Sequence, residues 1–447
     1  MIKNQVFITF NSFVIFHPPQ YKGFTMNERL LQFIWQFQYF NKQQLATSQG
    51  EVLQIEKPGT WNHHQGPDFS EAIIRIGATK WVGNIELHLR SSDWFRHHHT
   101  ADSNYSNIIL HVVWEEDVPV YDRNNNVIPT LVLQNRITKM LLDRYRQMME
   151  TTVTVPCHSF LPVLSNLAWS AWKERLAAER LERRSANVLL LLKQSNQHWE
   201  EVFWWLLAAN FGIKVNTALF EQVAQSLSVT LLSKHKNQIH QLEALLFGQA
   251  NLLSGEYTDE YALLLQREYR FLQKKYHLQP VNQQPAFLRM RPAAFPTLRL
   301  AQLAMLVNNS SHLFSQVKEI KDIKKVLDLF MITANDYWHY HYHFDEATVY
   351  QPKHLGKQMA ENILINTVIP VLFAYGLHSK EELYKDKAIH WLYQLTAERN
   401  QVTKKWEQSG IPHKSALDSQ ALIELTNNYC TVRRCLDCAV GNKILKS

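Results

Sequence analysis

Residues 66–90 read GPDFSEAIIRIGATKWVGNIELHLR, and this stretch decides the fold expected for the first third of the chain. Ala72–Ile76 is a short β-branched run, and Trp81–Leu89 alternates between apolar and polar residues. Both patterns are typical of β-strands. Gly77–Lys80 between them favours a hairpin turn. The stretch therefore predicts two neighbouring antiparallel strands.

Further strands are expected on both sides of this hairpin. Ile108–Trp114 is almost entirely apolar, as a central strand covered on both faces would be. The other two candidates are Val52–Ile55 and Val127–Leu133. From Ile137 onward the apolar spacing becomes helical, and helices are expected to continue to Leu425.

These patterns predict an α+β protein of two domains. A mixed α/β core is expected over residues 26–150, followed by a large all-α domain with a cysteine cluster near its end, over residues 151–447. A good amphipathic helix is expected at Glu28–Tyr39, directly after Met26. We interpret Met26 as the true start and residues 1–25 as an extension or a disordered start.

Composition and charge narrow the class of protein. The formal net charge is +7, and residues 1–150 hold 14 basic and 14 acidic residues, so residues 151–447 carry the whole excess. A modest positive excess favours a polyanionic partner such as nucleic acid. No apolar run reaches the roughly 18 residues of a membrane-spanning helix. Four cysteines are too few for a disulfide scaffold of 447 residues, so we predict a cytoplasmic protein.

Two acidic residues lie close to the predicted hairpin. Asp68 precedes its first strand, and Glu86 follows 18 residues later within the second. Alternate strand residues share a face, so Glu86, His88 and Arg90 are expected to point the same way. Buried carboxylates need a metal ion or a charge partner. The pattern favours a metal site, and the simpler interpretation is a turn cap beside ordinary exposed strand residues.

The pair Pro67-Asp68 and the later Glu86-Leu87-His88 resemble the signature of the PD-(D/E)XK nuclease superfamily. The resemblance implies a restriction-endonuclease-like core in which Asp68 and Glu86 hold Mg²⁺ or Mn²⁺. It implies hydrolysis of phosphodiester bonds in DNA or RNA, with the ion activating water. In that family a lysine stands where this chain has His88.

The histidine leaves two interpretations open. In the first, His88 activates or orients water and Arg90 supports the phosphate, so that the protein is a metal-dependent nuclease. In the second, the nuclease fold is catalytically degenerate and serves as a nucleic-acid-binding or scaffold protein.

A histidine-rich loop supports a third hypothesis. His97-His98-His99 and Asp102 follow the second hairpin strand, and His63 and His64 precede Gly66. If these residues converge near Asp68 and Glu86, they suit Zn²⁺, Mn²⁺ or Fe²⁺, and the protein would be a metal hydrolase of a small substrate. The alternative is an exposed polar loop, with Asp93 and Asp102 capping turns.

Cysteines form a second candidate metal site. Cys430, Cys435 and Cys438 lie near the C-terminus, and Cys157 lies at the expected domain boundary. Four sulfur ligands suit Zn²⁺ or an iron–sulfur cluster, with His158 as an alternative fourth ligand. Some PD-(D/E)XK nucleases are similar in holding such a cluster with three late cysteines and one distant one. The alternative is a set of buried free thiols.

Three features of the helical part bear on function. Basic residues near Phe and Trp are expected to track a phosphate backbone. We interpret the aromatic stretch Tyr337–Phe344 as a helix–helix seam rather than a base-stacking surface, and Lys173–Arg184 as a solvated helix face. The basic residues are Arg289, Arg291, Arg299, Lys321, Lys324, Lys325, Arg433 and Arg434.

From Met26 to its end, the chain also resembles an uncharacterised bacterial protein family, a domain of unknown function. The stretches that carry this resemblance are residues 66–69, 83–88, 91–94, 243–250, 291–299 and 435–438. Because that family has no assigned activity, the resemblance implies no function.

Overall fold

The structure is a computed structural model that describes residues 26–447 except 63 and 311. The predictions for residues 1–25 and for His63 therefore lie outside the described residues. The chain forms two compact units, of which unit 1 runs to Val163 and also includes Val432–Ser447, and unit 2 is Leu164–Thr431. The boundary thus lies later than the expected residue 150. The mixed α/β part followed by a large helical part agrees with the predicted fold class.

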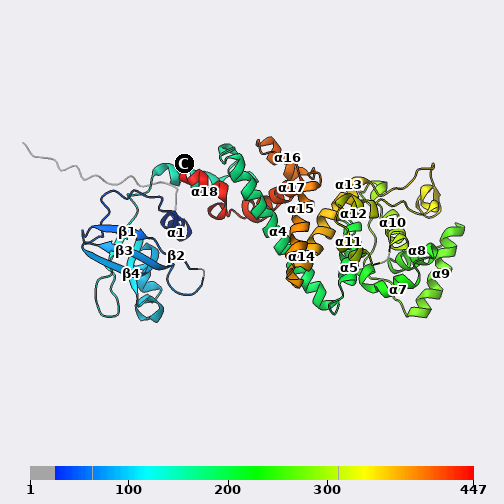
Figure 1. Cartoon of the computed structure of the whole chain (residues 1–447), viewed down its shortest axis with the longest axis horizontal. Helices are drawn as coiled ribbons and strands as arrows, with labels where there is room; N and C mark the ends of the chain where they lie inside the picture. The colour runs from blue at the N-terminus through cyan, green and yellow to red at the C-terminus, as the bar shows by residue number, and fades with distance from the viewer. Residues whose placement is uncertain (1–25, 63, 311) are drawn as a thin grey trace, which may run out of the picture. The chain divides into compact units, whose positions relative to one another are not determined.

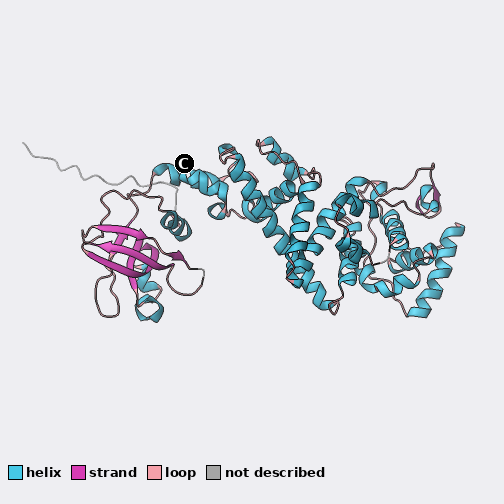
Figure 2. Ribbon diagram, viewed as in Figure 1, coloured by secondary structure: helices cyan, strands magenta, loops and turns pink. Residues whose placement is uncertain are grey.

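Unit 1 is built on a mixed sheet (Figure 2). The strands are β1 (Leu53–Lys57), β2 (Thr60–Trp61), β3 (Phe69–Ile76), β4 (Thr79–Arg90), β5 (Ile108–Glu115) and β6 (Thr130–Val132). Their order is β1-β3-β4-β5-β6, and β2 pairs with β3. The pairs β1–β3 and β3–β4 are antiparallel, whereas β4–β5 and β5–β6 are parallel. The predicted hairpin is β3–β4.

Two glycines make this hairpin and its neighbour possible. Gly77 takes the turn between β3 and β4 with φ +57°, a conformation that glycine adopts without strain. Gly83 lies where β5 begins, and a Cβ there would lie 2.5 Å from Cγ2 of Ile109. Any larger residue at 83 would therefore push β5 away from β4.

The central strand β4 is covered on both of its faces. Ile85 and Leu87 are fully buried, and so are Glu86 at 5% exposure and His88 at 1%. The interpretation of Glu86 and His88 as ordinary exposed strand residues is wrong. Both polar side chains must find partners inside the unit, because an unpaired buried charge is costly.

Helix α1 (Glu28–Phe37) covers part of the sheet and packs against β4. The side chain of Asn27 caps its first turn by accepting a 2.9 Å hydrogen bond from the Leu30 N–H. Leu30, Leu31 and Ile34 form its buried stripe. The helix ends at Phe37, two residues before the predicted end, because the φ of +54° at its C-cap Gln38 breaks the helical path.

The crossover from β4 to the parallel β5 is short and made of single helical turns. It contains α2 (Asp93–Arg96) and the 3₁₀ turns η1 (His99–Ala101) and η2 (Ser103–Tyr105). Trp94 anchors it in a small core with Val120 and Ile128. Asp93 accepts a hydrogen bond from the Arg90 N–H, and Asp102 caps η2, as expected for turn-capping residues.

The C-terminal segment belongs to unit 1, which was not predicted from the sequence. It contains η8 (Cys435–Asp437) and α18 (Ala439–Lys446), which packs on α3 (Lys139–Glu150). Asp437 forms a 2.9 Å ion pair with Arg29, and Asn442 accepts a 2.8 Å hydrogen bond from the Tyr39 hydroxyl. Residues more than 400 positions apart are thereby joined in one unit.

Unit 2 is helical, with one small hairpin (Figure 1). The hairpin pairs β7 (His341–His343) with β8 (Glu346–Ala347). The α-helices are α4 (Asn166–Gln194), α5 (Trp199–Phe211), α6 (Thr217–Ser226), α7 (Val229–Lys234), α8 (Ile239–Gln249), α9 (Glu260–Tyr276), α10 (Pro296–Asn309), α11 (Leu313–Glu319), α12 (Ile323–Leu329), α13 (Lys357–Ile363), α14 (Ile369–Ser379), α15 (Glu382–Gln394), α16 (Gln401–Gln408) and α17 (Ala416–Leu425).

The charged segment Lys173–Arg184 is a solvated face only in part, since Glu174, Arg175, Glu182 and Arg183 are exposed but Lys173 is buried. It lies on α4, which packs along α17. Lys173 is 7% exposed and donates to Oδ1 of Asp418 at 3.0 Å and to the Pro412 carbonyl at 2.7 Å. Arg183 pairs with the buried Glu424 at 2.6 Å. The carboxylate partners of Lys173 and Arg183 are on another helix, whereas Arg175 pairs with Glu179 on α4 itself, as the predicted i,i+4 pairing requires.

The aromatic stretch Tyr337–Phe344 is not a helix–helix seam either. It forms the 3₁₀ turn η5 (Asp336–His339) and strand β7. Its rings are nevertheless packed, since Trp338 stacks on Phe247 at 5.1 Å and Tyr337 stacks on Tyr261 at 4.3 Å.

One helical stretch, Lys357–Ser379, is long and apolar enough to cross a membrane by length and composition. Of its apolar window, 72% is buried within the structure. Such burial is what the core helix of a globular unit requires, and α14 packs against both α4 and α15.

Candidate functional site

The two acidic residues predicted from the sequence lie side by side in unit 1. Phe69 of β3 pairs with Ile85 of β4, so Asp68 and Glu86 lie at the next position of the same register. The Asp68 N–H donates to Oε2 of Glu86 at 3.0 Å, and the Leu87 N–H donates to Oδ2 of Asp68 at 3.1 Å. The backbone of each strand therefore orients the carboxylate of the other.

Both carboxyl groups resist ionisation in the metal-free protein. Burial raises the pKa of Asp68 well above its ordinary range, and repulsion from Glu86 adds to the rise. Burial likewise raises the pKa of Glu86. Hydrogen bonds from backbone N–H groups oppose the effect without cancelling it. A half-buried carboxylate beside a buried one forms a site that a bound cation would stabilise.

Helix α1 adds two groups that the sequence reasoning missed. Nε2 of Gln32 donates to Oδ1 of Asp68 at 2.8 Å. The charge of Glu28 raises the pKa of both Asp68 and Glu86, which places a third carboxylate within electrostatic reach. Glu28 and Gln32 are four residues apart and so share a helix face. That spacing was visible in the sequence, but nothing in it indicated which part of the sheet the helix would cover.

The histidine-rich loop does converge on this site. His99 Nε2 lies 3.3 Å from Oε1 of Glu86, and His88 Nε2 lies 3.7 Å from the same oxygen. His97 Nδ1 lies 3.1 Å from His88 Nε2. One ring nitrogen from each of His88, His97 and His99 lies within 4.8 Å of the others, a set that fits a bound metal ion.

His111 on β5 completes the cluster and was not predicted from the sequence. Its Nε2 lies 2.8 Å from Nδ1 of His88. Burial lowers the pKa of His88 to about 2, and that of His111 to about 3, with neighbouring histidines adding to the effect. Both imidazoles are therefore neutral near pH 7. The apolar sequence around His111 did not indicate that this histidine contacts His88, because the contact depends on which strand pairs with β5.

The other predicted residues near this site lie outside it. Arg90 has 65% of its side chain exposed, and its Nε is 3.9 Å from a carboxylate oxygen of Glu115. His64 and His98 are exposed. His97 and His99 therefore join the site as expected for the loop. Arg90, the last residue of β4, instead has its side chain exposed beside Glu115.

The predicted cysteine site draws on both units. Cys157, Cys435 and Cys438 belong to unit 1, whereas Cys430 belongs to unit 2. All four side chains are buried. Burial raises the pKa of Cys157 to about 12, with the nearby thiols of Cys438 and Cys435 adding to the rise. Metal binding by these cysteines stays a prediction.

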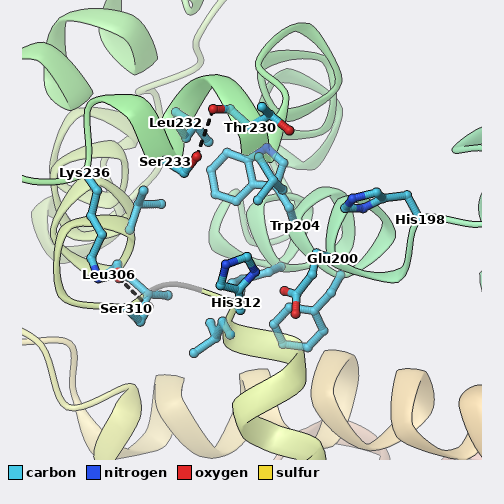
Figure 3. A pocket seen from close by; sticks show the side chains of 15 residues that line it. His198, Glu200, Trp204, Thr230, Leu232, Ser233, Lys236, Leu306, Ser310 and His312 are labelled. Atoms are coloured by element: carbon cyan, nitrogen blue, oxygen red, sulfur yellow. Dashed lines mark hydrogen bonds between the residues drawn. The ribbon is translucent and has the colours of Figure 1, made fainter.

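Unit 2 has a cavity of about 220 Å³ (Figure 3). Its lining is mostly apolar, with His198, Glu200, Lys236 and His312 around it. Two of these polar groups already cap helices, since Glu200 accepts hydrogen bonds from the Phe314 and Ser315 N–H groups and His198 accepts one from the Glu201 N–H. The cavity therefore offers less reactive chemistry than the site in unit 1.

The predicted basic surface of unit 2 is partly exposed. Arg289, Arg291, Lys321, Lys324 and Lys325 lie at the surface. Arg299 is half-buried instead, and this burial lowers its pKa to about 10. Its guanidinium donates to Oε1 of Gln302 at 3.0 Å.

Comparisons with known proteins give one match. The model of a family described as "Protein of unknown function (DUF2851)" matches residues 28–401. No curated protein and no solved structure matches. The matched segment includes α1, the whole sheet and every residue of the acidic and histidine clusters. Since it spans most of the 447 residues, the chain belongs to the DUF2851 family of proteins of unknown function.

Proposed function

We propose that unit 1 is a metal-dependent nuclease, with Asp68 and Glu86 as the ligands of a catalytic Mg²⁺ or Mn²⁺. The observation that carries this proposal is the pairing of the half-buried Asp68 and the buried Glu86 across β3 and β4, each carboxylate held by a backbone N–H of the opposite strand. Bound there, the ion would polarise the scissile phosphate and lower the pKa of the attacking water.

The strand order supports the resemblance to the PD-(D/E)XK core. An antiparallel hairpin carries the acids, and β5 then joins β4 in parallel on its other side. The arrangement leaves the carboxylates at the end of β4 next to the crossover loop. Fold likeness alone does not establish activity, so the proposal depends on the site chemistry.

His88 acts differently from the lysine it replaces. Its pKa of about 2, caused mainly by burial, makes it neutral and a poor base near pH 7. It therefore supplies no fixed positive charge to a phosphate. We assign it the role of orienting the groups around Glu86 rather than of accepting a proton. Gln32 orients Asp68 in the same way from α1.

Nucleic acid is the substrate class that the charge distribution favours. The chain has a net charge of +7, all of it in residues 151–447. Next to Asp68, Trp61 pairs with Phe69 in the sheet, and the Arg29 guanidinium lies 4.4 Å above the Trp61 ring. An aromatic ring beside a cation is suited to stack on a base and contact a phosphate. We retain the prediction that the protein is cytoplasmic.

The test is cleavage of labelled single- and double-stranded DNA and RNA by the full chain with Mg²⁺ or Mn²⁺. Asp68→Asn and Glu86→Gln keep the shape of each side chain, and each is expected to lower the rate at least about a hundredfold, because losing even an outer-shell partner costs up to that much. The matched control is Glu71→Gln on β3, whose carboxylate is 78% exposed and pairs with Lys57.

Two other outcomes would support the alternative functions. Salt-sensitive nucleic-acid binding without cleavage would favour the degenerate scaffold, for which the histidine at position 88 is the argument. No nucleic-acid binding, together with a tightly held transition metal, would favour a hydrolase of a small substrate, for which the His88–His97–His99 cluster is the argument.

A further inference from the structure

We propose that His88, His97 and His99, together with Glu86, form a separate binding site for a transition metal ion of the Zn²⁺ type. This site adjoins the Asp68–Glu86 pair and shares Glu86 with it. The inference goes beyond the proposed nuclease, because it concerns a second ion with a different ligand chemistry. Its test does not depend on any cleavage activity.

Three of the six distances within the cluster lie near those of a tetrahedral site, and the histidine ligand atoms all lie within 4.8 Å of one another. Metal–nitrogen bonds of 2.0–2.1 Å place two tetrahedral ligand atoms about 3.3 Å apart. Nε2 of His88 and Nδ1 of His97 are 3.1 Å apart, and Nε2 of His99 and Oε1 of Glu86 are also separated by 3.3 Å. The distance from His88 Nε2 to Glu86 Oε1 is 3.7 Å. An ion would need only small movements of these four groups.

Two buried ring nitrogens of the cluster have no hydrogen-bond partner, Nδ1 of His111 and Nε2 of His99, and the second faces Glu86. The His99 ring is held in that position by Tyr105, which stacks on it at 3.8 Å. An orphaned buried nitrogen costs free energy unless a ligand satisfies it. A metal ion between His99 and Glu86 would do so.

His111 supplies the support that a metal-bound histidine needs. When Nε2 of His88 binds a metal, its Nδ1 carries the proton and donates to Nε2 of His111, 2.8 Å away. Such a second hydrogen bond fixes the tautomer and the ring orientation of a ligand histidine. A buried chain of histidines without a metal is the simpler alternative, but it leaves Nε2 of His99 unpaired.

Glu86 connects the two sites through its two oxygens. Oε2 accepts the hydrogen bond from the Asp68 N–H, and Oε1 faces His88 and His99. A carboxylate that faces two ion sites is the usual bridge in two-metal centres, whose ions lie about 3.5–4 Å apart. The oxygen-rich side suits Mg²⁺ or Mn²⁺, and the imidazole-rich side suits Zn²⁺ or Co²⁺.

The test is a titration of the metal-free full chain with Co²⁺, followed by calorimetry and by visible absorption. His97→Asn is the informative variant, because His97 is exposed and its loss leaves the core intact. We expect its Co²⁺ affinity to fall at least about tenfold, the lower limit seen even for outer-shell losses. His98→Asn is the matched control in the same loop, since asparagine tolerates the φ of +60° at that position. It should bind Co²⁺ as wild type does.

Asp68→Asn separates this site from the proposed catalytic one. It should retain the cobalt spectrum while losing Mg²⁺-dependent cleavage. If the protein binds cobalt but cleaves no nucleic acid under any condition, the nuclease proposal is wrong and the transition-metal site is retained. The metal site itself is overturned if the wild type binds no stoichiometric cobalt, if His97→Asn binds it equally well, or if the only bound cobalt shows the near-ultraviolet bands of sulfur ligation.

Discussion

Oε2 of Glu86 accepts a 3.0 Å hydrogen bond from the backbone N–H of Asp68, its neighbour across β3 and β4. The donor is main chain, so this contact persists when the Asp68 side chain is replaced. The same register brings the two carboxyl groups together and raises the pKa of both through burial and, at Asp68, through the charge of Glu86. The arrangement suits a bound cation and destabilises the metal-free fold.

We therefore expect Glu86→Gln to stabilise the metal-free protein. Burial raises the pKa of Glu86 in the folded state above its unfolded value near 4.5. The wild-type fold therefore has its full stability only below about pH 4.5, and it loses stability as pH rises through the folded-state pKa. At pH 8.5 the melting temperature of Glu86→Gln should exceed that of the wild type by about 2–4 °C, the shift that about 1 kcal/mol produces in a domain of this size.

Scanning calorimetry in the presence of a chelator measures this difference. It should shrink toward pH 4, where the wild-type carboxyl is protonated in both states. The exposed Glu71→Gln should show no comparable shift at either pH. A Glu86→Gln protein that melts below the wild type at pH 8.5 would contradict the role assigned to burial.

Gln32 is expected to be a positioning residue that acts through Asp68. Its amide stabilises the charged carboxylate and so lowers the pKa of Asp68 against the effect of burial. In Gln32→Leu that pKa should rise, and the acidic limb of the pH profile of kcat/KM should move upward by about one pH unit, given roughly 1.5–3 kcal/mol for a hydrogen bond to a charge.

The matched control for this change is Gln36→Leu, one turn later on α1. Its pH profile should coincide with that of the wild type. If Gln32→Leu lowers the rate equally at all pH values, its role is structural and the assignment is wrong.

Lys173 should contribute to the stability of unit 2 through its buried pair with Asp418. Lys173→Met leaves the Asp418 carboxylate without its cation, and breaking a buried pair costs about 3–5 kcal/mol. Because Asp418 retains 21% exposure and backbone partners, we expect about 2–3 kcal/mol in urea unfolding.

Arg175→Met on the same helix is the control, since its pair with Glu179 is largely exposed and worth at most about 1 kcal/mol. The double variant Lys173→Met/Asp418→Asn should recover part of the loss. If Lys173→Met and Arg175→Met lower the free energy of unfolding equally, the buried pair of Lys173 with Asp418 contributes no more than an exposed pair, and the prediction is wrong.

Glu243 gives unit 2 a pH dependence of its own. Burial raises the pKa of this α8 carboxyl to about 7, despite hydrogen bonds from Tyr261 and Trp338. Stability should therefore fall between about pH 5 and pH 8, by at most roughly 3 kcal/mol at about 1.4 kcal/mol per pKa unit. Glu243→Gln should flatten that part of the curve of melting temperature against pH. A slope identical to the wild type's would show that Glu243 is ionised at a normal pKa.

Much of the local structure was predictable because it depends on neighbours in the chain. Alternation placed β4, glycine placed the turn at Gly77, and the capped amphipathic pattern placed α1. The order of Asp68 and Glu86 along the hairpin was visible in the sequence, but the register that aligns them was not. A bulge shifts the pairing by one residue between Ala72, which pairs with Gly83, and Phe69, which pairs with Ile85.

The partners from distant elements were not predictable in this way. Gln32 and Glu28 reach the site only because α1 packs on β4, and His111 only because β5 pairs in parallel beside it. The same limit explains the errors in unit 2. The charges of Lys173 and Arg183 looked solvated in the sequence because their carboxylate partners lie more than 200 residues away on α17.

The sequence by itself determined the hairpin β3–β4, the helix α1 and that two carboxylates lie on one hairpin, because these follow from spacing along a single strand, helix or turn. Only the tertiary structure decided that the polar face of β4 is buried, that three histidines converge on Glu86, and that residues 432–447 complete unit 1. The reason is physical: burial and electrostatic coupling depend on distances through space, and chain packing sets those distances between elements far apart in the sequence.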